Sequence, residues 1–408
     1  MMLEGPLLHG VLGRLPEPAL HLAASNIALA LSLVIESPVI MLLATSIALV
    51  KDGGTFLALR RFTVSLCFWL TVLTALLAFT PLYNVVVFSL LDAPRPIGDS
   101  ARPALQIMLL WTAAIGWRRF YQGVLVKMGR SSLVSWGTAI RLGSAAITAL
   151  LLIRFAPHLT GSEVFGIVLM AAVISEALVT TLFARPLVRT HFAGKVEGQP
   201  LSQRAILKFH LPLAGTTLLT LLAQPMTAAA LSRLDDPKMT LAAWPVIFST
   251  LLVIRGWCFA VQEITVALYE TSSGRLRQFS WLVGLGATGV LALLAFTPIL
   301  PAYLEHVLKV APELRPLVVQ GCEICIALPL ITSLGSWARG ALVATQRTPK
   351  VYTGMAINIG SNGAMLVAGV LFGLPGILVG TVSFVAAATI ELVYLGKQAA
   401  KIADKPDR

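Results

Sequence analysis

The chain carries one sequence pattern twice, and this repeat limits what it can fold into. Several short motifs of the first half return in the second half, each block at one constant spacing. The pairs are Leu22-Ala23-Ala24 with Leu241-Ala242-Ala243, Leu33-Val34-Ile35 with Leu252-Val253-Ile254, and Gly123-x-Leu125-Val126 with Gly340-x-Leu342-Val343. Both copies lie in strongly apolar sequence. Two homologous halves of a polytopic membrane chain predict a secondary transporter whose site lies between the halves.

Composition places the chain in the membrane. Of its 408 residues, 57% are hydrophobic and 12% are charged, and continuous apolar runs predict an all-α polytopic membrane protein. The net charge of +12 calls for no nucleic-acid partner, because such chains concentrate Lys and Arg in cytoplasmic loops. The sequence has no G-x-x-x-x-G-K-[ST] loop and no residue set with metal-ligand spacing. We therefore expect no enzyme, no catalytic residue, no metal and no cofactor beyond a proton or sodium gradient.

Apolar runs of about the length of a bilayer crossing predict twelve transmembrane helices in two six-helix lobes. The expected spans are an opening segment ending near Gly13, then Leu20–Val50, Phe62–Phe79, Ala104–Val126, Leu133–Phe155, Val164–Ala184, Phe209–Leu231, Leu241–Tyr269, Phe279–Ile299, Leu317–Thr345, Val351–Phe372 and Gly376–Leu395. The predicted domains are an N-terminal lobe over 1–190, a cytoplasmic linker over 191–206, a C-terminal lobe over 207–396 and a cytoplasmic tail over 397–408. As a helix, Met1–Gly13 reaches only about 20 Å, so the first helix is expected to be truncated.

The loop charges favour one orientation. With the N-terminus inside, most Lys and Arg of the loops lie on the cytoplasmic side. This predicts a multi-pass protein of the inner (cytoplasmic) membrane, surrounded by lipid, with both termini cytoplasmic, and we expect a monomer. An even number of spans in each half makes the halves parallel, related by an axis along the membrane normal.

Charged side chains remain inside the expected spans, and all the basic ones are arginines. They are Arg118, Arg119, Arg141, Arg255 and Arg339, with the acids Glu4, Glu36, Glu176, Glu263, Glu323 and Glu391. A charge at the bilayer centre costs about 2.5–3.5 kcal/mol on insertion scales, so each should face protein or water and have a partner. Guanidinium groups suit carboxylates and phosphates, which points to an anionic small-molecule substrate.

Glu36 and Arg255 occupy equivalent positions of the repeat, each directly after the shared Leu-Val-Ile. The two charges are expected at mirrored places on the walls of one cleft, where they can pair in one state and separate in another. The alternative is that each pairs within its own half. We favour this alternative for Glu36, because Pro38 can open the helix and offer polar backbone. Arg255 is expected to face the cavity and bind substrate.

Further substrate-binding candidates lie on the other helices. Arg118 and Gln122 are one turn apart on one helix face, although Arg118 can also serve as an anchor near the cytoplasmic end. Arg141 lies deeper in the membrane. Asn358 is its counterpart in the second copy, so both halves keep a polar group at this position.

The coupling ion is expected to bind a glutamate. Glu263 is the first candidate, since it lies about two turns beyond Arg255 on roughly the same face, and Glu36 is the second. A lone buried glutamate can hold a proton near neutral pH, whereas the alternative for Glu263 is a stable pair with an intramembrane arginine. Glu176 and Glu391 end the two halves at matching places and are expected to be structural.

The arrangement resembles the multidrug and toxic compound extrusion (MATE) transporters of the multidrug/oligosaccharidyl-lipid/polysaccharide exporter superfamily. The resemblance rests on twelve spans in two lobes, with Arg14-Leu15-x-x-Pro18 and Arg233-Leu234-x-x-Pro237 opening the second span of each. Two stretches look similar to the progressive ankylosis (ANK) proteins and their bacterial relatives. They are Arg255-Gly256-Trp257 through Gln262-Glu263-Ile264, and Arg119-x-x-x-Gly123-x-Leu125 to Arg130.

The resemblance implies a V-shaped pair of lobes, alternating access and export. MATE-type members are proton- or sodium-coupled antiporters of cationic drugs, and ANK-type members are linked to efflux of pyrophosphate, nucleotides or organic acids. The chain departs from the MATE pattern in its short first span and in its intramembrane arginines, so we expect an exporter of a small organic or phosphate-bearing anion. The alternatives are a cationic multidrug antiporter, a flippase for a lipid-linked saccharide and a non-transporting scaffold.

Overall fold

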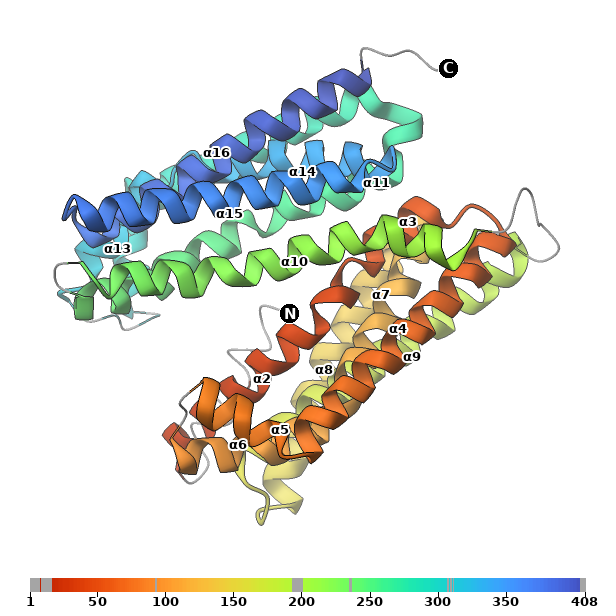
Figure 1. Ribbon diagram of the computed structural model, residues 1–408, viewed down its shortest axis with the longest axis horizontal. Coiled ribbons are helices and arrows are strands. Elements are labelled where there is room, and N and C mark those ends of the chain that lie inside the picture. Colours follow the sequence, from red (N-terminus) through yellow and green to blue (C-terminus); the bar gives the residue numbers. More distant parts are fainter. Residues whose placement is uncertain are drawn as a thin grey trace. The chain divides into compact units, whose positions relative to one another are not determined.

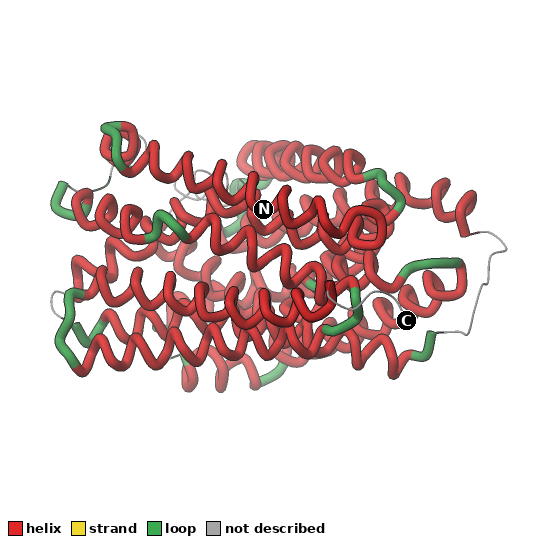
Figure 2. Tube along the Cα trace, turned by 90° about the horizontal axis from the view of Figure 1, so that it is seen from above, coloured by secondary structure: helices red, strands yellow, loops and turns green. Residues whose placement is uncertain are grey.

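The computed structural model describes residue 8 and residues 17–91, 94–192, 201–234, 237–306, 308, 310 and 312–403. In this part of the chain the regular secondary structure is helical throughout, without a strand (Figure 1; Figure 2). The elements of the first half are α2 (Pro18–Ile40), α3 (Leu42–Leu49), α4 (Gly53–Phe79), α5 (Leu82–Asn84), the π-helix η1 (Val85–Leu90), α6 (Arg95–Ile107), the 3-10 helix η2 (Met108–Leu110), α7 (Trp111–Lys127), α8 (Ser131–Phe155) and α9 (Gly161–Phe192). Those that follow are α10 (Gln203–Leu231), α11 (Pro237–Ala295), α12 (Ile299–His306), α13 (Arg315–Ile324), α14 (Leu328–Ala344), α15 (Thr348–Leu371) and α16 (Gly376–Ala403).

Nine helices of the described residues are long and apolar enough to cross a membrane. They are Leu20–Leu49, Gly53–Phe79, Ser131–Phe155, Gly161–Thr190, Gln203–Leu231, Met239–Ser272, Gly274–Ala295, Thr348–Leu371 and Gly376–Lys401. The bent pair α13 and α14, with 46° between its parts, makes ten if it is one span. The chain is thus a multi-pass membrane protein. The predicted truncated first helix and Glu4 lie outside the described residues.

Three spans that the hydropathy predicts as single helices are interrupted. The run Leu20–Val50 divides at Met41 into α2 and α3, and Ala104–Val126 divides at η2 into α6 and α7. The run Leu317–Thr345 divides into α13 and α14. Proline explains this third break, because Pro329 in the first turn of α14 has no N–H to donate to a carbonyl one turn earlier. Hydropathy reports the length of an apolar run, whereas the break depends on backbone hydrogen bonds.

The chain forms two compact units, Met1–Ala214 and Gly215–Arg408, so the division falls within α10, beyond the expected linker. In the first unit, α8 packs along α9, α3 along α7, and α2 along α6 and α7. In the second unit, α11 packs along α14, α15 along α16, and α14 along α16. The long α11 is two helices joined at Ser272, whose backbone is not helical.

The two units share the packing that the repeat predicts. Helices α7 and α14 begin and end at equivalent repeat positions, and each follows a break. A side chain on Gly123 would lie 2.6 Å from the Leu43 carbonyl oxygen, and one on Gly340 would lie 2.8 Å from that of Gln262. These neighbours are themselves equivalent in the repeat. Glycine therefore allows the same close helix contact in both units.

Candidate functional site: charged centres within the two units

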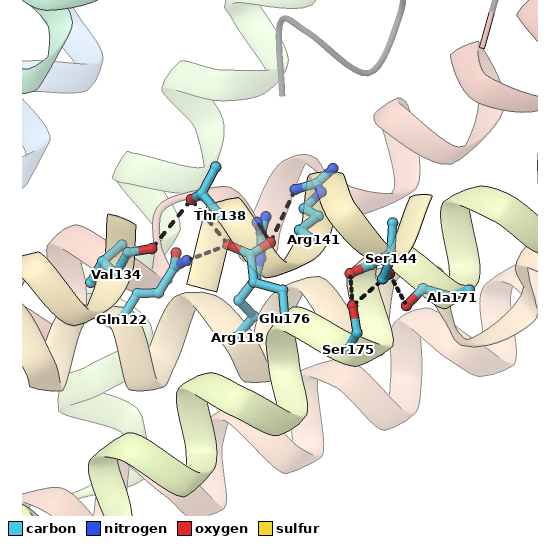
Figure 3. Close-up of polar contacts among 10 residues, drawn as sticks. Arg118, Gln122, Val134, Thr138, Arg141, Ser144, Ala171, Ser175 and Glu176 are labelled. Atoms are coloured by element: carbon cyan, nitrogen blue, oxygen red, sulfur yellow. Dashed lines mark hydrogen bonds and ion pairs between the residues drawn. The ribbon is translucent and has the colours of Figure 1, made fainter. Parts of the chain in front are cut away.

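A fully buried carboxylate organises the first unit. Glu176 of α9 accepts hydrogen bonds from Arg118 Nη1 at 2.5 Å and Arg141 Nη1 at 3.3 Å, both to Oε2 (Figure 3). Gln122 Nε2 donates to the other oxygen, Oε1, at 3.0 Å, and Thr138 Oγ1 lies 3.5 Å from it. We call these five residues the Glu176 centre. It joins α7, α8 and α9 through one side chain.

Helix periodicity brings the donors of the Glu176 centre together. Arg118 and Gln122 are one turn apart on α7, and Thr138 and Arg141 are nearly one turn apart on α8. Two guanidinium groups meet one carboxylate here, and Arg118 and Arg141 are only 3% and 1% exposed. The Nε and Nη2 atoms of Arg118 are buried without a hydrogen-bond partner. The centre therefore carries excess positive charge and unused donors, which suit an anionic group or water.

The second unit has a matching centre around Glu391 of α16. Arg339 of α14 donates to Oε1 through Nε at 3.0 Å and through Nη2 at 2.5 Å. Asn358 of α15 donates to Oε2 at 2.9 Å. We call these three residues the Glu391 centre. One guanidinium meets one carboxylate, so this centre is balanced where the first is not.

The two centres use equivalent repeat positions, but the amide and the guanidinium that contact the glutamate have changed places. In the repeat, Gln122 is equivalent to Arg339, and Arg141 is equivalent to Asn358. The first unit thus places its amide on α7 and a guanidinium on α8, and the second places its guanidinium on α14 and its amide on α15. Arg118 has no polar counterpart, because Gly335 stands in its place. The excess charge of the Glu176 centre is therefore peculiar to the first unit.

Glu36 lies in the interior of the first unit, on α2. Its Oε2 accepts a hydrogen bond from Trp111 Nε1 at 2.6 Å, and the residue is fully buried. Its Oε1 has no hydrogen-bond partner. The guanidinium groups of Arg119, Arg118 and Arg141 lie within electrostatic range of the carboxylate. Glu36 thus has its direct partner within its own half, with one oxygen unused.

Arg255 takes the equivalent position on α11 of the second unit. Its Nε donates to Thr332 Oγ1 at 2.7 Å, and its guanidinium lies 5.2 Å from the Phe259 ring centre and 5.1 Å from that of Phe384. It forms no ion pair with a carboxylate in the described part of the chain. Aromatic faces and a hydroxyl orient the guanidinium without neutralising it.

The remaining predicted coupling residue is Glu263, which is half-buried on α11 about two turns beyond Arg255. Within the described residues, no group of three or more His, Cys, Asp or Glu side chains could hold a metal ion. Cys322 and Cys325 are free and buried in an apolar cluster of the second unit, together with Val318 and Leu328. They pack as small hydrophobic side chains.

A buried histidine that was not among the predicted site residues lies at the helix break of the first unit. His210 of α10 has its Nε2 2.8 Å from the Pro38 carbonyl oxygen, and its Nδ1 lies 2.8 Å from Thr45 Oγ1. The carbonyl oxygen accepts from Nε2, and His210 thereby joins the start of α10 to α2 and α3. The sequence did contain a signal for this contact. It was a histidine within an apolar run, together with a proline, Pro38, inside another predicted span.

Comparison with protein-family models and with curated proteins gives no match. Solved structures are similar over nearly the whole chain. An outward-facing multidrug resistance MATE family transporter of the MOP superfamily has 15% identity and a TM-score of 0.74, covering 99% of this chain and 93% of that one. A variant of the Vibrio cholerae MATE transporter VcmN has 17% identity and a TM-score of 0.78, covering 98% of this chain and 93% of that one.

Two further structures extend the comparison. A MOP superfamily transporter from Pyrococcus furiosus, described by a reversed polarity of its binding pocket and a different function, has 16% identity and a TM-score of 0.71 and covers 98% of this chain and 92% of its own. An inward-facing MATE family transporter has 15% identity and a TM-score of 0.58, covering 100% of this chain and 96% of that one. The chain therefore has the fold of the MATE transporters of the MOP superfamily.

Proposed function

We propose that the chain is a secondary active transporter that works by alternating access and exports a small organic or phosphate-bearing anion. The fold supports the transport mode, because structures with this fold have been solved in outward-facing and inward-facing states. The proposal includes twelve transmembrane helices in two lobes, in the inner membrane, with both termini cytoplasmic. The ANK-type relatives remain part of the proposal for the substrate class.

The environment of Arg255 is the observation that carries the anionic substrate. A charge within the membrane costs about 2.5–3.5 kcal/mol on insertion scales unless it is compensated. Arg118, Arg141 and Arg339 each form an ion pair with a glutamate. Arg255 instead contacts a hydroxyl and two aromatic rings. Its Nη1 and Nη2 make no hydrogen bond within the described residues, and a carboxylate or phosphate would accept from both in a bidentate contact.

The Glu176 centre and Asn358 contribute to substrate binding in this proposal. Arg118 has two unused donors, and Arg141 shares its carboxylate, so an anion can bind without first breaking the pair between Arg118 Nη1 and Glu176. Gln122 and Asn358 donate to glutamates and hold these acids in place. Glu36 couples transport to protons, because it is a buried carboxylate whose Oε1 is unpartnered. Glu263 is a second coupling group.

A cationic multidrug antiporter is the second candidate, and the names of the similar structures favour it. In that function the glutamates bind the substrate. The arginines then act only as structural partners of Glu176 and Glu391. The Pyrococcus furiosus transporter supports the first candidate, since this fold there is described with reversed pocket polarity.

The test is efflux from proteoliposomes that contain the purified full-length chain under an imposed pH gradient. Citrate, pyrophosphate and ATP serve as anionic probes, and ethidium and tetraphenylphosphonium serve as cationic probes. The proposal expects gradient-dependent movement of at least one anion, lost in Arg255→Gln and retained in the control Arg154→Gln, whose side chain lies exposed at the end of α8. Movement of the cations alone, unaffected by Arg255→Gln, would establish the second candidate instead.

A further inference from the structure

A chain of hydroxyl groups links a buried histidine to a carboxylate at one end of the first unit. His21 Nδ1 lies 3.3 Å from Ser100 Oγ, which lies 3.1 Å from Ser162 Oγ. Ser162 Oγ in turn lies 3.3 Å from Thr160 Oγ1, and Thr160 Oγ1 donates to Glu163 Oε2 at 2.8 Å. His21 and Ser162 are buried, whereas Thr160 is exposed. The hydroxyl chain thus runs from the surface to the first turn of α2.

The ionised carboxylate gives this chain one direction. Thr160 has a single hydroxyl hydrogen, and it points to Glu163. Ser162 is then free to donate to Thr160, and Ser100 to donate to Ser162, so that His21 Nδ1–H donates to Ser100. Every hydrogen points toward Glu163. The Thr160–Glu163 pair is also the capping box of α9, but a capping box does not require the three further members that reach His21.

Beyond His21, polar side chains continue along one face of α2. Ser25, Ser32 and Glu36 follow His21 at spacings of four, eleven and fifteen residues, which keep them on one side of a helix over roughly 22 Å. They are 2%, 3% and 0% exposed. Ser25 Oγ, Ser32 Oγ and Glu36 Oε1 all lack a hydrogen-bond partner. Buried polar atoms are nearly always satisfied, so these three unsatisfied atoms along one helix face are places where water would be stabilised.

The second unit shows that the fold does not require these polar residues. On the α2 face, the equivalent repeat positions carry Thr240 for His21, Trp244 for Ser25, Leu251 for Ser32 and Arg255 for Glu36. In the hydroxyl chain, they carry Leu317 for Ser100, Pro375 for Thr160, Ile377 for Ser162 and Leu378 for Glu163. Trp244 and Leu251 belong to apolar clusters of that unit. The close helix approach is nevertheless the same, because a Cβ on Gly161 would meet the His21 side chain as a Cβ on Gly376 would meet that of Thr240. At the positions of Ser25 and Ser32 the same helix packing is thus apolar in the second unit and polar in the first.

We propose that the polar face of α2, formed by His21, Ser25, Ser32 and Glu36, is a proton path that leads from Glu163 through the hydroxyl chain to Glu36. Ordered waters bridge the serines. In the proposed orientation, the path opens on the outer side of the membrane. The inference rests on the proposed function, and it adds the route by which the coupling proton reaches its site.

The transfer balances at every member of the path. When Glu163 is protonated, the direction of the hydrogen bonds reverses: the carboxylic acid donates to Thr160, Thr160 to Ser162, Ser162 to Ser100, and Ser100 to His21 Nδ1, which accepts in the tautomer that carries its hydrogen on Nε2. The proton of Glu163 then passes to Thr160, the proton of Thr160 to Ser162, that of Ser162 to Ser100 and that of Ser100 to His21 Nδ1. Each hydroxyl gains one proton and loses one, so in this part of the path only Glu163 and His21 change charge. His21 then releases its Nε2 proton to the waters beside Ser25 and returns to the neutral form, and Glu36 receives the proton at the end of the path. Other charged groups near the entrance are the exposed Glu17 before α2 and Asp99 on α6, beside Ser100. Around Glu36 they are Arg118 and Arg119 of α7 and Arg141 of α8.

The rate at which Glu36 takes up a proton tests the path. Trp111 reports the ionisation of Glu36, because its Nε1 donates to that carboxylate. The fluorescence change after an external pH step is followed by stopped flow in proteoliposomes, and the signal of Trp111→Phe is subtracted. Ser32→Leu inserts the residue that the second unit carries. It should slow the response by about 100-fold, the low end of what a positioned proton-transfer group contributes.

Matched variants separate the path from general effects on folding. Ser32→Thr keeps the hydroxyl and should respond nearly as fast as the wild type. Thr63→Val removes another buried, unpartnered hydroxyl, on α4, and should respond at the wild-type rate. If Ser32→Leu fails to fold, the smaller Ser25→Ala and Ser32→Ala double variant and His21→Phe replace it. Each is expected to slow the response.

The outcomes distinguish the path from the proposed function. If Glu36→Gln removes the fluorescence response and Ser32→Leu responds at the wild-type rate, the path is wrong and Glu36 remains the coupling group. If Glu36→Gln responds like the wild type, the coupling role of Glu36 is wrong, and the path loses its end point. A slow response in Ser32→Leu together with a silent Glu36→Gln supports both.

Discussion

Arg141 and Asn358 occupy the same place in the two units, and each donates to the glutamate on the following helix. Arg141 Nη1 lies 3.3 Å from Glu176 Oε2, and Asn358 Nδ2 lies 2.9 Å from Glu391 Oε2. One repeat position thus supplies a charged donor in the first unit and a neutral donor in the second. Both units keep the glutamate that this donor contacts, Glu176 in the first and Glu391 in the second. Duplication therefore preserved the carboxylate and changed the charge around it.

Removing the carboxylate should harm the first unit more than the second. Glu176→Gln removes the carboxylate that both Arg118 and Arg141 contact, and breaking a buried pair in this way costs about 3–5 kcal/mol. Glu391→Gln leaves only Arg339, whose side chain is 19% exposed and can be hydrated. We expect a clearly larger fall of the thermal unfolding midpoint in detergent for Glu176→Gln. Equal falls, or a larger one for Glu391→Gln, would show that the excess charge of the Glu176 centre has no energetic consequence.

The glycines at the close helix contacts should not tolerate alanine. In Gly123→Ala the new Cβ would lie 2.6 Å from the Leu43 carbonyl oxygen, and overpacking of this kind costs about 1–3 kcal/mol. Gly340→Ala should behave alike, since its Cβ would lie 2.8 Å from a backbone oxygen. Gly143→Ala is the control, because nothing lies within 4 Å of its Cβ and helical alanine is favoured. Thermal unfolding of the three variants checks the prediction, which a destabilised Gly143→Ala with an unchanged Gly123→Ala would contradict.

Tyr83 should make the stability of the first unit depend on pH in the alkaline range. Burial raises the pKa of this tyrosine from 10.0 to about 12, and its hydroxyl donates to the Gly98 carbonyl oxygen at 2.5 Å. Because the unfolded chain loses the phenol proton near pH 10 and the folded chain keeps it, stability is full below pH 10 and falls toward pH 12. Tyr83→Phe should lack this part of the fall. Unfolding midpoints of both proteins across this range give the difference, and parallel curves would count against the assignment.

Charge alone should not replace the guanidinium of Arg255. Arg255→Lys keeps a positive charge but loses the planar fork that donates to Thr332 and lies over Phe259 and Phe384. In the proteoliposome assay we expect anion efflux to fall at least about tenfold in Arg255→Lys, equivalent to the loss of one charge-assisted hydrogen bond of about 1.5 kcal/mol. The unfolding midpoint should stay near that of the wild type. Full efflux by Arg255→Lys would show that this position requires only a positive charge.

The repeat, the apolar runs and helix periodicity were sufficient to predict the all-helical membrane fold. Similar structures confirm that the fold is of the MATE type. Pro38 predicted an opening of the helix in this region, but the position of the break at Met41 and the break at η2 were not predicted. Hydropathy does not report where a carbonyl such as that of Pro38 finds a partner on another helix. The twelve-helix count stays a prediction, because the opening segment lies outside the described residues.

The charged residues were predicted more completely than their contacts. The repeat identified Glu176 and Glu391 as a matched pair, but the rotation of α9 against α7 that brings Arg118 to Glu176 has no local sequence signal. Ser25 and Ser32 were missed because isolated serines in an apolar helix are common. Their helical spacing with Glu36, together with the apolar residues at the equivalent positions of the other half, would have revealed the face.

The most direct test of the account is anion efflux from proteoliposomes under a pH gradient, measured for the wild type, Arg255→Gln and Glu36→Gln side by side. The wild type should move an anionic probe only when the gradient is imposed. Arg255→Gln should move no anion even when the gradient is imposed, and Glu36→Gln should move the anion at a rate that does not depend on the gradient. Gradient-driven transport of cations alone, with Arg255→Gln as active as the wild type, would contradict it.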